Sequence, residues 1–216
     1  MLLEEIVRDN FLDEDYPVSF NMDEFKSLDS FKKRISHCEQ HLTKIGAGSS
    51  RIVYKIDDEK VLKLAKNAKG ISQNEVEINH SEDYYLFELG IIAKVFDYEQ
   101  NMLWLEMELA EKASPMKFEK INNISFKSYC TYLDYYNSDV MGKSRYKTSV
   151  DDELKELCEN NDFVSSMTNF VGNYGVPIGD LKRISSYGIV KSDNIEKTVL
   201  IDFGLNDDVY NSHYKR

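Results

Sequence analysis

Apolar residues recur at helical spacing near the start of the chain and change to a strand-like pattern after residue 41. Asn21 and Glu24 have the spacing of a capping box, in which each side chain satisfies a backbone N–H group at the start of a helix. We therefore predict an amphipathic helix over residues 22–40, within an N-terminal extension that covers residues 1–41. Packing on the domain is the commoner use of such a stripe, and docking of a partner is the alternative. The stripe is formed by Leu28, Phe31, Ile35 and Cys38.

Short alternating runs follow, separated by polar turns and by one helical stretch. The helical stretch, residues 70–89, ends at Gly90, which suits a helix C-cap. The order of the runs predicts a lobe with an antiparallel sheet over residues 42–110. The predicted strands are residues 42–45, 51–57, 61–66, 91–98 and 102–109.

The rest of the chain has mostly helical spacing. Residues 110–115 have the character of a crossing linker, and residues 116–175 are predicted to be mainly helical. Two strands are predicted near the C-terminus, at residues 187–191 and 198–201. We therefore expect an α+β fold of two lobes, in which a reduced and mainly helical lobe covers residues 111–216.

Composition narrows the possible partners. The 216 residues carry a formal net charge of −11, and the pI is about 4.9. An acidic chain repels a phosphate backbone, so nucleic-acid binding is not expected. Apolar runs are too short to cross a membrane, and the start of the chain lacks a signal-peptide pattern, so a cytoplasmic location is expected. The odd cysteine count, without paired metal-ligand spacing, indicates a reducing compartment and no structural zinc.

A glycine-containing turn lies between the first two predicted strands. Gly46 and Gly48 lack Cβ atoms, so the segment from Gly46 through Ala47 and Gly48 to Ser49 can approach a phosphate closely. An ordinary β-turn is the commoner use of such a sequence. The glycine-containing turn therefore indicates phosphate binding only in combination with the motifs that follow it in the sequence.

A lysine lies on the third predicted strand. Lys63 alternates with Val61 in a run that is otherwise suited to burial, and an ammonium group there needs anions nearby. A lysine that reaches water along the strand edge is the alternative. A carboxylate partner on the next helix would be Glu77 or Glu75, which point about 200° apart around the helix axis, so only one can face Lys63.

Two acidic motifs lie in the C-terminal half. Asp180 is followed by Leu181 and Lys182, and Asp202 is followed by Phe203 and Gly204 after the apolar run that ends at Ile201. A carboxylate at a buried strand end is a suitable Mg²⁺ ligand. A turn that closes a hairpin is an equally common use of the second tripeptide.

Taken in order, these motifs resemble the protein-kinase-like superfamily over about residues 42–206, and especially small, degenerate kinase-like proteins of bacteria and bacteriophages. The resemblance implies ATP and Mg²⁺ as cofactors. It implies ATP binding by Gly46, Ala47, Gly48, Ser49, Val53, Lys63, Glu77, Met107, Glu108 and Ala110. It further implies catalysis by Asp180, Lys63 and Asp202 and metal binding by Asp202 and Ser185. An ordinary strand end is the alternative for the segment that contains Met107 and Glu108.

The match to this family is partial. Ile178 and Gly179 replace the usual His-Arg, and Ser185 stands where an asparagine is expected. Only residues 205–216 follow Gly204, so neither an activation segment nor a peptide-docking platform is expected. Two functions remain: a minimal phosphotransferase that moves the ATP γ-phosphate to a hydroxyl acceptor, or a catalytically inactive kinase-like protein that binds nucleotide or a protein partner. For either function, the expected location is the host cytoplasm if the protein is phage-encoded. The oligomeric state has no sequence signature.

Overall fold

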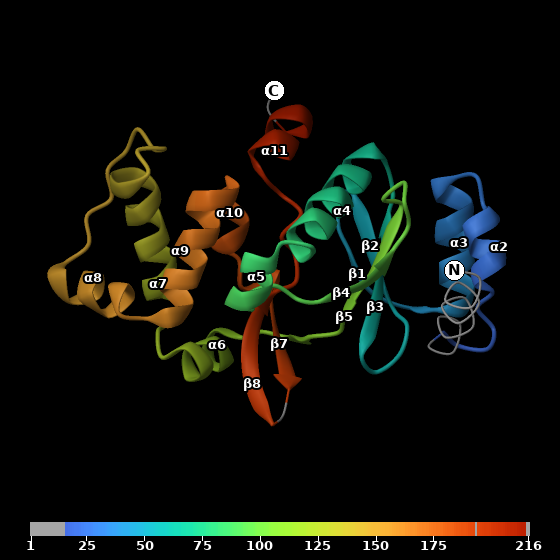
Figure 1. Ribbon diagram of the computed structural model, residues 1–216, viewed down its shortest axis with the longest axis horizontal. Coiled ribbons are helices and arrows are strands. Elements are labelled where there is room, and N and C mark those ends of the chain that lie inside the picture. The colour runs from blue at the N-terminus through green and yellow to red at the C-terminus, as the bar shows by residue number, and fades with distance from the viewer. Residues whose placement is uncertain (1–15, 193, 215–216) are drawn as a thin grey trace. The chain divides into compact units, whose positions relative to one another are not determined.

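The computed structural model describes residues 16–192 and 194–214, and its elements are labelled in Figure 1. The chain divides into two compact units. Unit 1 comprises the residues up to Asn74 together with Val95–Leu109, and unit 2 comprises Glu75–Lys94 and the residues from Ala110 onward. The division falls inside helix α4 (Ala68–Ser81).

Unit 1 contains a five-stranded antiparallel sheet with strand order β1-β2-β3-β5-β4. All five predicted strands are present, with ends shifted by a few residues, because their alternating pattern matches one buried face. The central strand, β3, is paired on both sides and is buried along most of its length. The strands are β1 (Thr43–Ala47), β2 (Arg51–Lys55), β3 (Lys60–Ala65), β4 (Val95–Tyr98) and β5 (Trp104–Glu108).

The single helix predicted over residues 22–40 is wrong, because two helices form there. They are α2 (Met22–Ser27) and α3 (Phe31–His41). Asn21 caps α2 as expected, with its Oδ1 accepting from the N–H of Glu24 at 2.9 Å. Ser30 has an extended backbone and caps α3, so a second N-cap interrupts an apolar spacing that continues across the break.

The two N-terminal helices pack on the sheet of unit 1 (Figure 1). Their apolar residues form one core with side chains from β2, β3 and β5. Cys38 of the predicted stripe belongs to this core and Leu28 and Ile35 pack against it, which confirms packing on the domain for these three residues. This core contains Tyr16, Phe20, Met22, Phe25, Cys38, Leu42, Ile52, Tyr54, Ile56, Leu62, Leu64 and Trp104.

The helix predicted over residues 70–89 is likewise divided, into α4 and α5 (Tyr84–Leu89). Asp83 caps α5 by accepting from the backbone N–H groups of Tyr85 and Leu86. Gly90 adopts the left-handed conformation at the end of α5 (φ 57°), as predicted for a C-cap glycine. The sequence-based prediction missed the need for glycine at Gly70, where a Cβ atom would lie 2.3 Å from the carbonyl oxygen of Ser50.

Unit 2 is mainly helical, with a small three-stranded sheet of order β6-β7-β8. Its strands are β6 (Glu111–Lys112), β7 (Tyr187–Ser192) and β8 (Ile195–Leu200), and part of the predicted linker 110–115 is thus a strand. The longer helices are α6 (Pro115–Asn122), α7 (Phe126–Tyr135), α8 (Asp152–Glu159) and α9 (Asp162–Tyr174). The shorter elements are the π-helical turn η1 (Tyr136–Val140), α10 (Ile178–Leu181), the 3₁₀ turn η2 (Ile184–Ser186) and α11 (Asp207–His213).

These elements confirm the expected α+β class, with an antiparallel sheet in one unit and a mainly helical second unit. An aromatic cluster forms part of the core of unit 2, with Phe118 contacting its neighbours at ring-centroid distances of 5.1 to 5.6 Å. The cluster consists of Phe118, Phe126, Tyr129, Phe163 and Tyr187. No helix in the described part of the chain combines the length and apolar character needed to cross a membrane.

Candidate functional site

The glycine-containing segment forms the tip of the β1–β2 hairpin in unit 1. The backbone carbonyl of Gly48 accepts from Lys66 Nζ at 3.0 Å, and the carbonyl of Ser49 accepts from Asn67 Nδ2 at 3.3 Å. Lys69 Nζ lies 3.4 Å from the hydroxyl of Ser49. The tip is therefore held by the segment that leads into α4 and lies beside two ammonium groups, which the motif-based prediction did not include.

The protein's own packing does not require glycine at either position of this tip. A Cβ atom on Gly46 would lie 3.7 Å from Val53 Cβ, an ordinary contact, and a Cβ on Gly48 would meet no atom within 4 Å. Ala47 and Ser49 are exposed. The open space beside a Cβ-free backbone, together with the neighbouring lysines, fits the requirements of a phosphate group.

Arg51 is the first residue of β2, just after the hairpin tip, and its side chain has a structural role. Its side chain is buried, with 7% of its surface exposed, and Nη1 lies 3.4 Å from Asn74 Oδ1. Asn74 in turn donates to the backbone carbonyl of Met102 at 2.9 Å. Arg51 thus ties β2 to α4 and to the turn before β5, all within unit 1.

Lys63 lies in the middle of the central strand of unit 1, where it pairs with Val53 on β2 and with Leu105 on β5. Only 5% of its surface is exposed, so the strand places an ammonium group in a largely buried position. Met107 is buried on β5, Glu108 is the half-buried last residue of that strand, and Ala110 follows shortly after it.

The two glutamates considered for α4 lie in different environments. Glu77 is fully buried, and its Oε1 accepts from the backbone N–H of Phe203 at 3.1 Å. Glu75 is exposed. Within unit 2, α4 therefore contacts the Asp-Phe-Gly segment through Glu77.

Asp180 and Asp202 are brought together in unit 2 although 22 residues separate them in sequence. The backbone N–H of Ile201 donates to the carbonyl of Ser186 at 2.9 Å, and the hydroxyl of Ser186 donates to the carbonyl of Asp180 at 2.8 Å. Burial and the negative charge of Asp202 raise the pKa of Asp180, and Arg183, 3.4 Å away, opposes this shift.

Phe203 turns inward next to Asp202 and is almost fully buried. Its ring stacks on His80 of α4 with centroids 6.2 Å apart, and Phe170 and Tyr174 of α9 contact the same imidazole edge-on at 5.3 Å. Burial lowers the pKa of His80, while the nearby carboxylates of Glu77 and Asp83 act in the opposite direction. Sequence patterns missed this contact because His80 carries no motif of its own.

The residues predicted to bind metal are oxygen donors at the surface of unit 2. Asp202 is exposed at the end of β8, and Ser185 is exposed in η2. Over residues 16–192 and 194–214, no group of three or more His, Cys, Asp or Glu side chains is arranged to hold a metal ion. Magnesium commonly takes one or two protein carboxylates and completes its shell with phosphates and water, so this donor set fits Mg²⁺ bound together with a nucleotide.

Comparison with known proteins found no family model and no curated protein that matches this chain. Solved structures do match. A streptomycin–ATP complex of the aminoglycoside phosphotransferase APH(2″)-IIa is 12% identical with a TM-score of 0.30, covering 61% of this chain and 45% of its own length. A choline/ethanolamine kinase family protein from Mesorhizobium loti is 12% identical with a TM-score of 0.35, covering 76% of this chain and 57% of its own. A GDP and kanamycin complex of APH(2″)-IIia is 13% identical with a TM-score of 0.35, covering 86% and 71%. The chain thus spans about half the length of the first two.

Proposed function

We propose that this protein is a minimal ATP-dependent phosphotransferase of the protein-kinase-like type, related to the small kinase-like proteins of bacteria and bacteriophages. The proximity of Asp180 and Asp202 in unit 2 is the observation that carries the proposal. In a phosphotransferase one carboxylate must face the acceptor hydroxyl and a second must face the metal, so two such groups are needed close together.

The placement of the other motif residues supports the same function. The glycines lie at a hairpin tip beside two lysines, Lys63 lies on the third strand, and Glu77 lies on the helix that follows. Under the proposal, Lys63 binds ATP phosphates, Val53 covers the adenine, and backbone groups near Glu108 bind the adenine edge. The full set of ATP-binding residues remains the one predicted from the motifs.

The proposed reaction is a direct transfer. The γ-phosphorus forms a bond to the acceptor oxygen as its bond to the oxygen shared with the β-phosphate breaks, and ADP leaves with that electron pair. The acceptor's proton passes to the carboxylate of Asp180, whose raised pKa brings it closer to that of an effective general base. Asp202, with Ser185 as a second donor, would hold Mg²⁺, which when bound neutralises charge on the phosphates.

The test compares Asp202→Asn with Asp208→Asn, an exposed carboxylate on α11 that has no assigned role. ADP formation from MgATP is measured with each protein in a cell extract that supplies acceptors. We expect Asp202→Asn to lower the rate about 1,000-fold, because charge stabilisation in the transition state is lost, and Asp208→Asn to leave it unchanged.

A wild-type protein that forms no ADP above the rate of Asp202→Asn would contradict the enzymatic function. The same preparations can be used to capture binding proteins from the extract. If wild type forms no ADP and both wild type and Asp202→Asn capture the same binding protein equally well, the inactive, partner-binding function would be favoured.

A further inference from the structure

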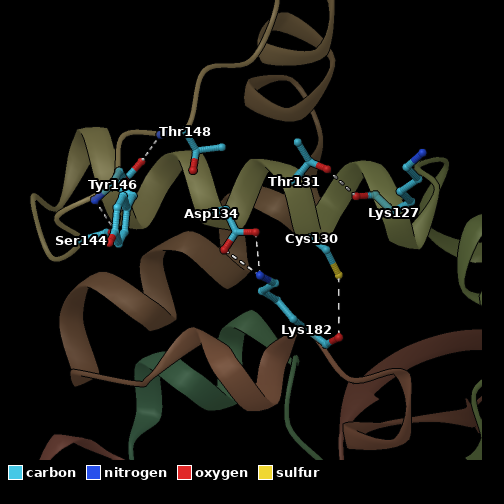
Figure 2. Close-up of polar contacts among 9 residues, drawn as sticks. Lys127, Cys130, Thr131, Asp134, Ser144, Tyr146, Thr148 and Lys182 are labelled. Atoms are coloured by element: carbon cyan, nitrogen blue, oxygen red, sulfur yellow. Dashed lines mark hydrogen bonds and ion pairs between the residues drawn. The ribbon is translucent and has the colours of Figure 1, made fainter.

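Lys182 is the third residue of the Asp-Leu-Lys motif that begins at Asp180, and its ammonium group is held by α7. Lys182 Nζ lies 2.7 Å from Asp134 Oδ1 and 2.6 Å from Oδ2, so both carboxylate oxygens of Asp134 accept from it (Figure 2). Each side chain is about one-third exposed, at 33% and 37%. Partial burial and contact with both oxygens make this pair more constrained than an ordinary surface ion pair.

The backbone of the same motif is held by side chains as well. The carbonyl of Asp180 accepts from Ser186 Oγ at 2.8 Å, and the carbonyl of Leu181 accepts from the Tyr187 hydroxyl at 2.8 Å. The thiol of Cys130, also on α7, lies 4.0 Å from the carbonyl of Lys182 (Figure 2). Three consecutive carbonyls are thus occupied by side-chain donors.

Helix α7 contributes to this arrangement at several points. Cys130 and Asp134 contact Lys182 directly, and Tyr129 reaches the motif through a hydroxyl contact of 2.8 Å with Tyr187. Burial raises the pKa of Cys130 to about 11, which keeps the thiol protonated as a donor. The segment that carries Asp180 is therefore anchored to one face of α7, and the Asp134–Lys182 ion pair is the only charged contact in that anchor among the described residues.

We propose that Asp134 is a positioning residue for phosphotransfer, which acts through Lys182 to hold Asp180 in place. Lys182 is then a tether and not a ligand of the nucleotide phosphates. Moving Lys182 onto a phosphate would leave the partly buried Asp134 carboxylate without its cation, which opposes such a movement. The inference rests on the proposed function, because it assumes that Asp180 is the group to be positioned.

The test is a double-mutant cycle of Asp134→Asn and Lys182→Met, with MgATP binding measured by calorimetry and transfer measured as ADP formation. Each single variant should lower kcat about 100-fold through displacement of Asp180 and leave the Kd for MgATP unchanged. The double variant should be no slower than the slower single variant, because both remove the same contact. Lys182→Arg keeps a cation for Asp134 and should retain most of the wild-type rate.

Lys117→Met is the matched control, because Lys117 makes two ion pairs in unit 2, with Glu111 and Glu196, away from the motif. It should change neither kcat nor Kd. The proposal is overturned if Lys182→Met weakens MgATP binding while Asp134→Asn does not, since Lys182 would then be a phosphate ligand. It is also overturned if both variants keep the wild-type kcat.

Hydrogen exchange separates this proposal from the proposed function. The N–H groups of Lys182, Arg183 and Ser186 donate to backbone carbonyls within residues 178–183, and they report on order in this segment without any catalytic readout. We expect these amides to exchange faster in Asp134→Asn and Lys182→Met, to similar extents, and at the wild-type rate in Lys117→Met. If wild type transfers no phosphate but the amides respond in this way, the tether stands and the proposed function fails. Unchanged exchange in both variants overturns the tether whatever the activity.

Discussion

The predicted functional residues of the two units are held in place by different kinds of contact. In unit 1, Lys63 lies on a strand that is paired on both sides, so the backbone ladders of β2 and β5 determine its position. In unit 2, Asp180 lies on a four-residue helix, and side-chain bonds from Ser186 and Tyr187 hold the carbonyls around it. A site held by a sheet ladder should tolerate loss of a single side chain, whereas a site held by side chains should not.

Replacement of Lys63 by alanine is the strongest test of the sheet-held region. A ligand present at 100 times its Kd stabilises a protein by about 2.7 kcal/mol, and we expect Lys63→Ala to lose that MgATP-dependent stabilisation while the sheet stays folded. Thermal unfolding with and without MgATP measures both effects. Lys60→Ala, at the start of the same strand, is the control and should keep the stabilisation. If Lys63→Ala is stabilised by MgATP as much as wild type is, Lys63 does not bind the phosphates.

The difference between a site held by a sheet and a site held by side chains also explains which features of the fold and of the site could be predicted from the sequence. The strands of unit 1 were predictable because alternation along a strand reports directly on one buried face. The breaks between α2 and α3 and between α4 and α5 were missed, because the apolar spacing continues across both of them. The N-cap residues Ser30 and Asp83 were the sequence signals that could have revealed the breaks.

In unit 2, the motifs around Asp180 and Asp202 were visible, but their supports were not. Asp134 is 48 residues from Lys182 in sequence, and Glu77 is 126 residues from Phe203. Contacts over such separations leave no periodicity or spacing in a single sequence. The same reason applies to Lys66 and Lys69, whose contacts with the glycine tip depend on how the chain returns from β3.

Glu77→Leu should have the next largest effect, and it tests a contact held by a side chain. Oε1 of Glu77 accepts from Phe203 N–H inside the core, and a leucine side chain offers that donor no acceptor. Leaving a buried donor without its acceptor costs about 1 to 3 kcal/mol, so we expect a loss of about 2 kcal/mol in the free energy of unfolding. Glu75→Leu, on the exposed side of α4, should change it little. Equal losses measured by urea unfolding would show that Glu77 does not hold the Asp-Phe-Gly segment.

Acidification provides a smaller, graded test through His80. Because burial lowers its pKa below the usual 6.5, the folded state keeps His80 neutral while the unfolded state takes up a proton as pH falls through 6.5. Neutral His80 therefore makes its full contribution to the free energy of unfolding above pH 6.5. Between pH 6.5 and the lower pKa of the folded state, this contribution decreases by up to about 1.4 kcal/mol per pH unit as the pH falls. His80→Phe keeps a ring against Phe203 but cannot titrate.

The measurement is the difference in unfolding free energy between wild type and His80→Phe at pH 7.5 and at pH 5.5. Taking the difference cancels the titration of carboxylates that lie away from His80, because both proteins share it. Wild type should lose more stability than the variant over this interval. Parallel losses would show that His80 is not kept neutral by its aromatic surroundings.

The smallest expected effect distinguishes two adjacent serines, Ser185 and Ser186, which lie on the same turn. Ser186 is buried and donates to the Asp180 carbonyl, so Ser186→Ala should lower the free energy of unfolding by about 1 kcal/mol and should also slow transfer by loosening Asp180. Ser185 is exposed, so Ser185→Ala should leave stability unchanged.

If Ser185 contributes a metal ligand as proposed, its loss should raise the Mg²⁺ concentration needed for half-maximal ADP formation, which Ser186→Ala should not do. A Mg²⁺ requirement that is the same in wild type and Ser185→Ala would remove Ser185 from the metal site and leave Asp202 as its assigned protein ligand.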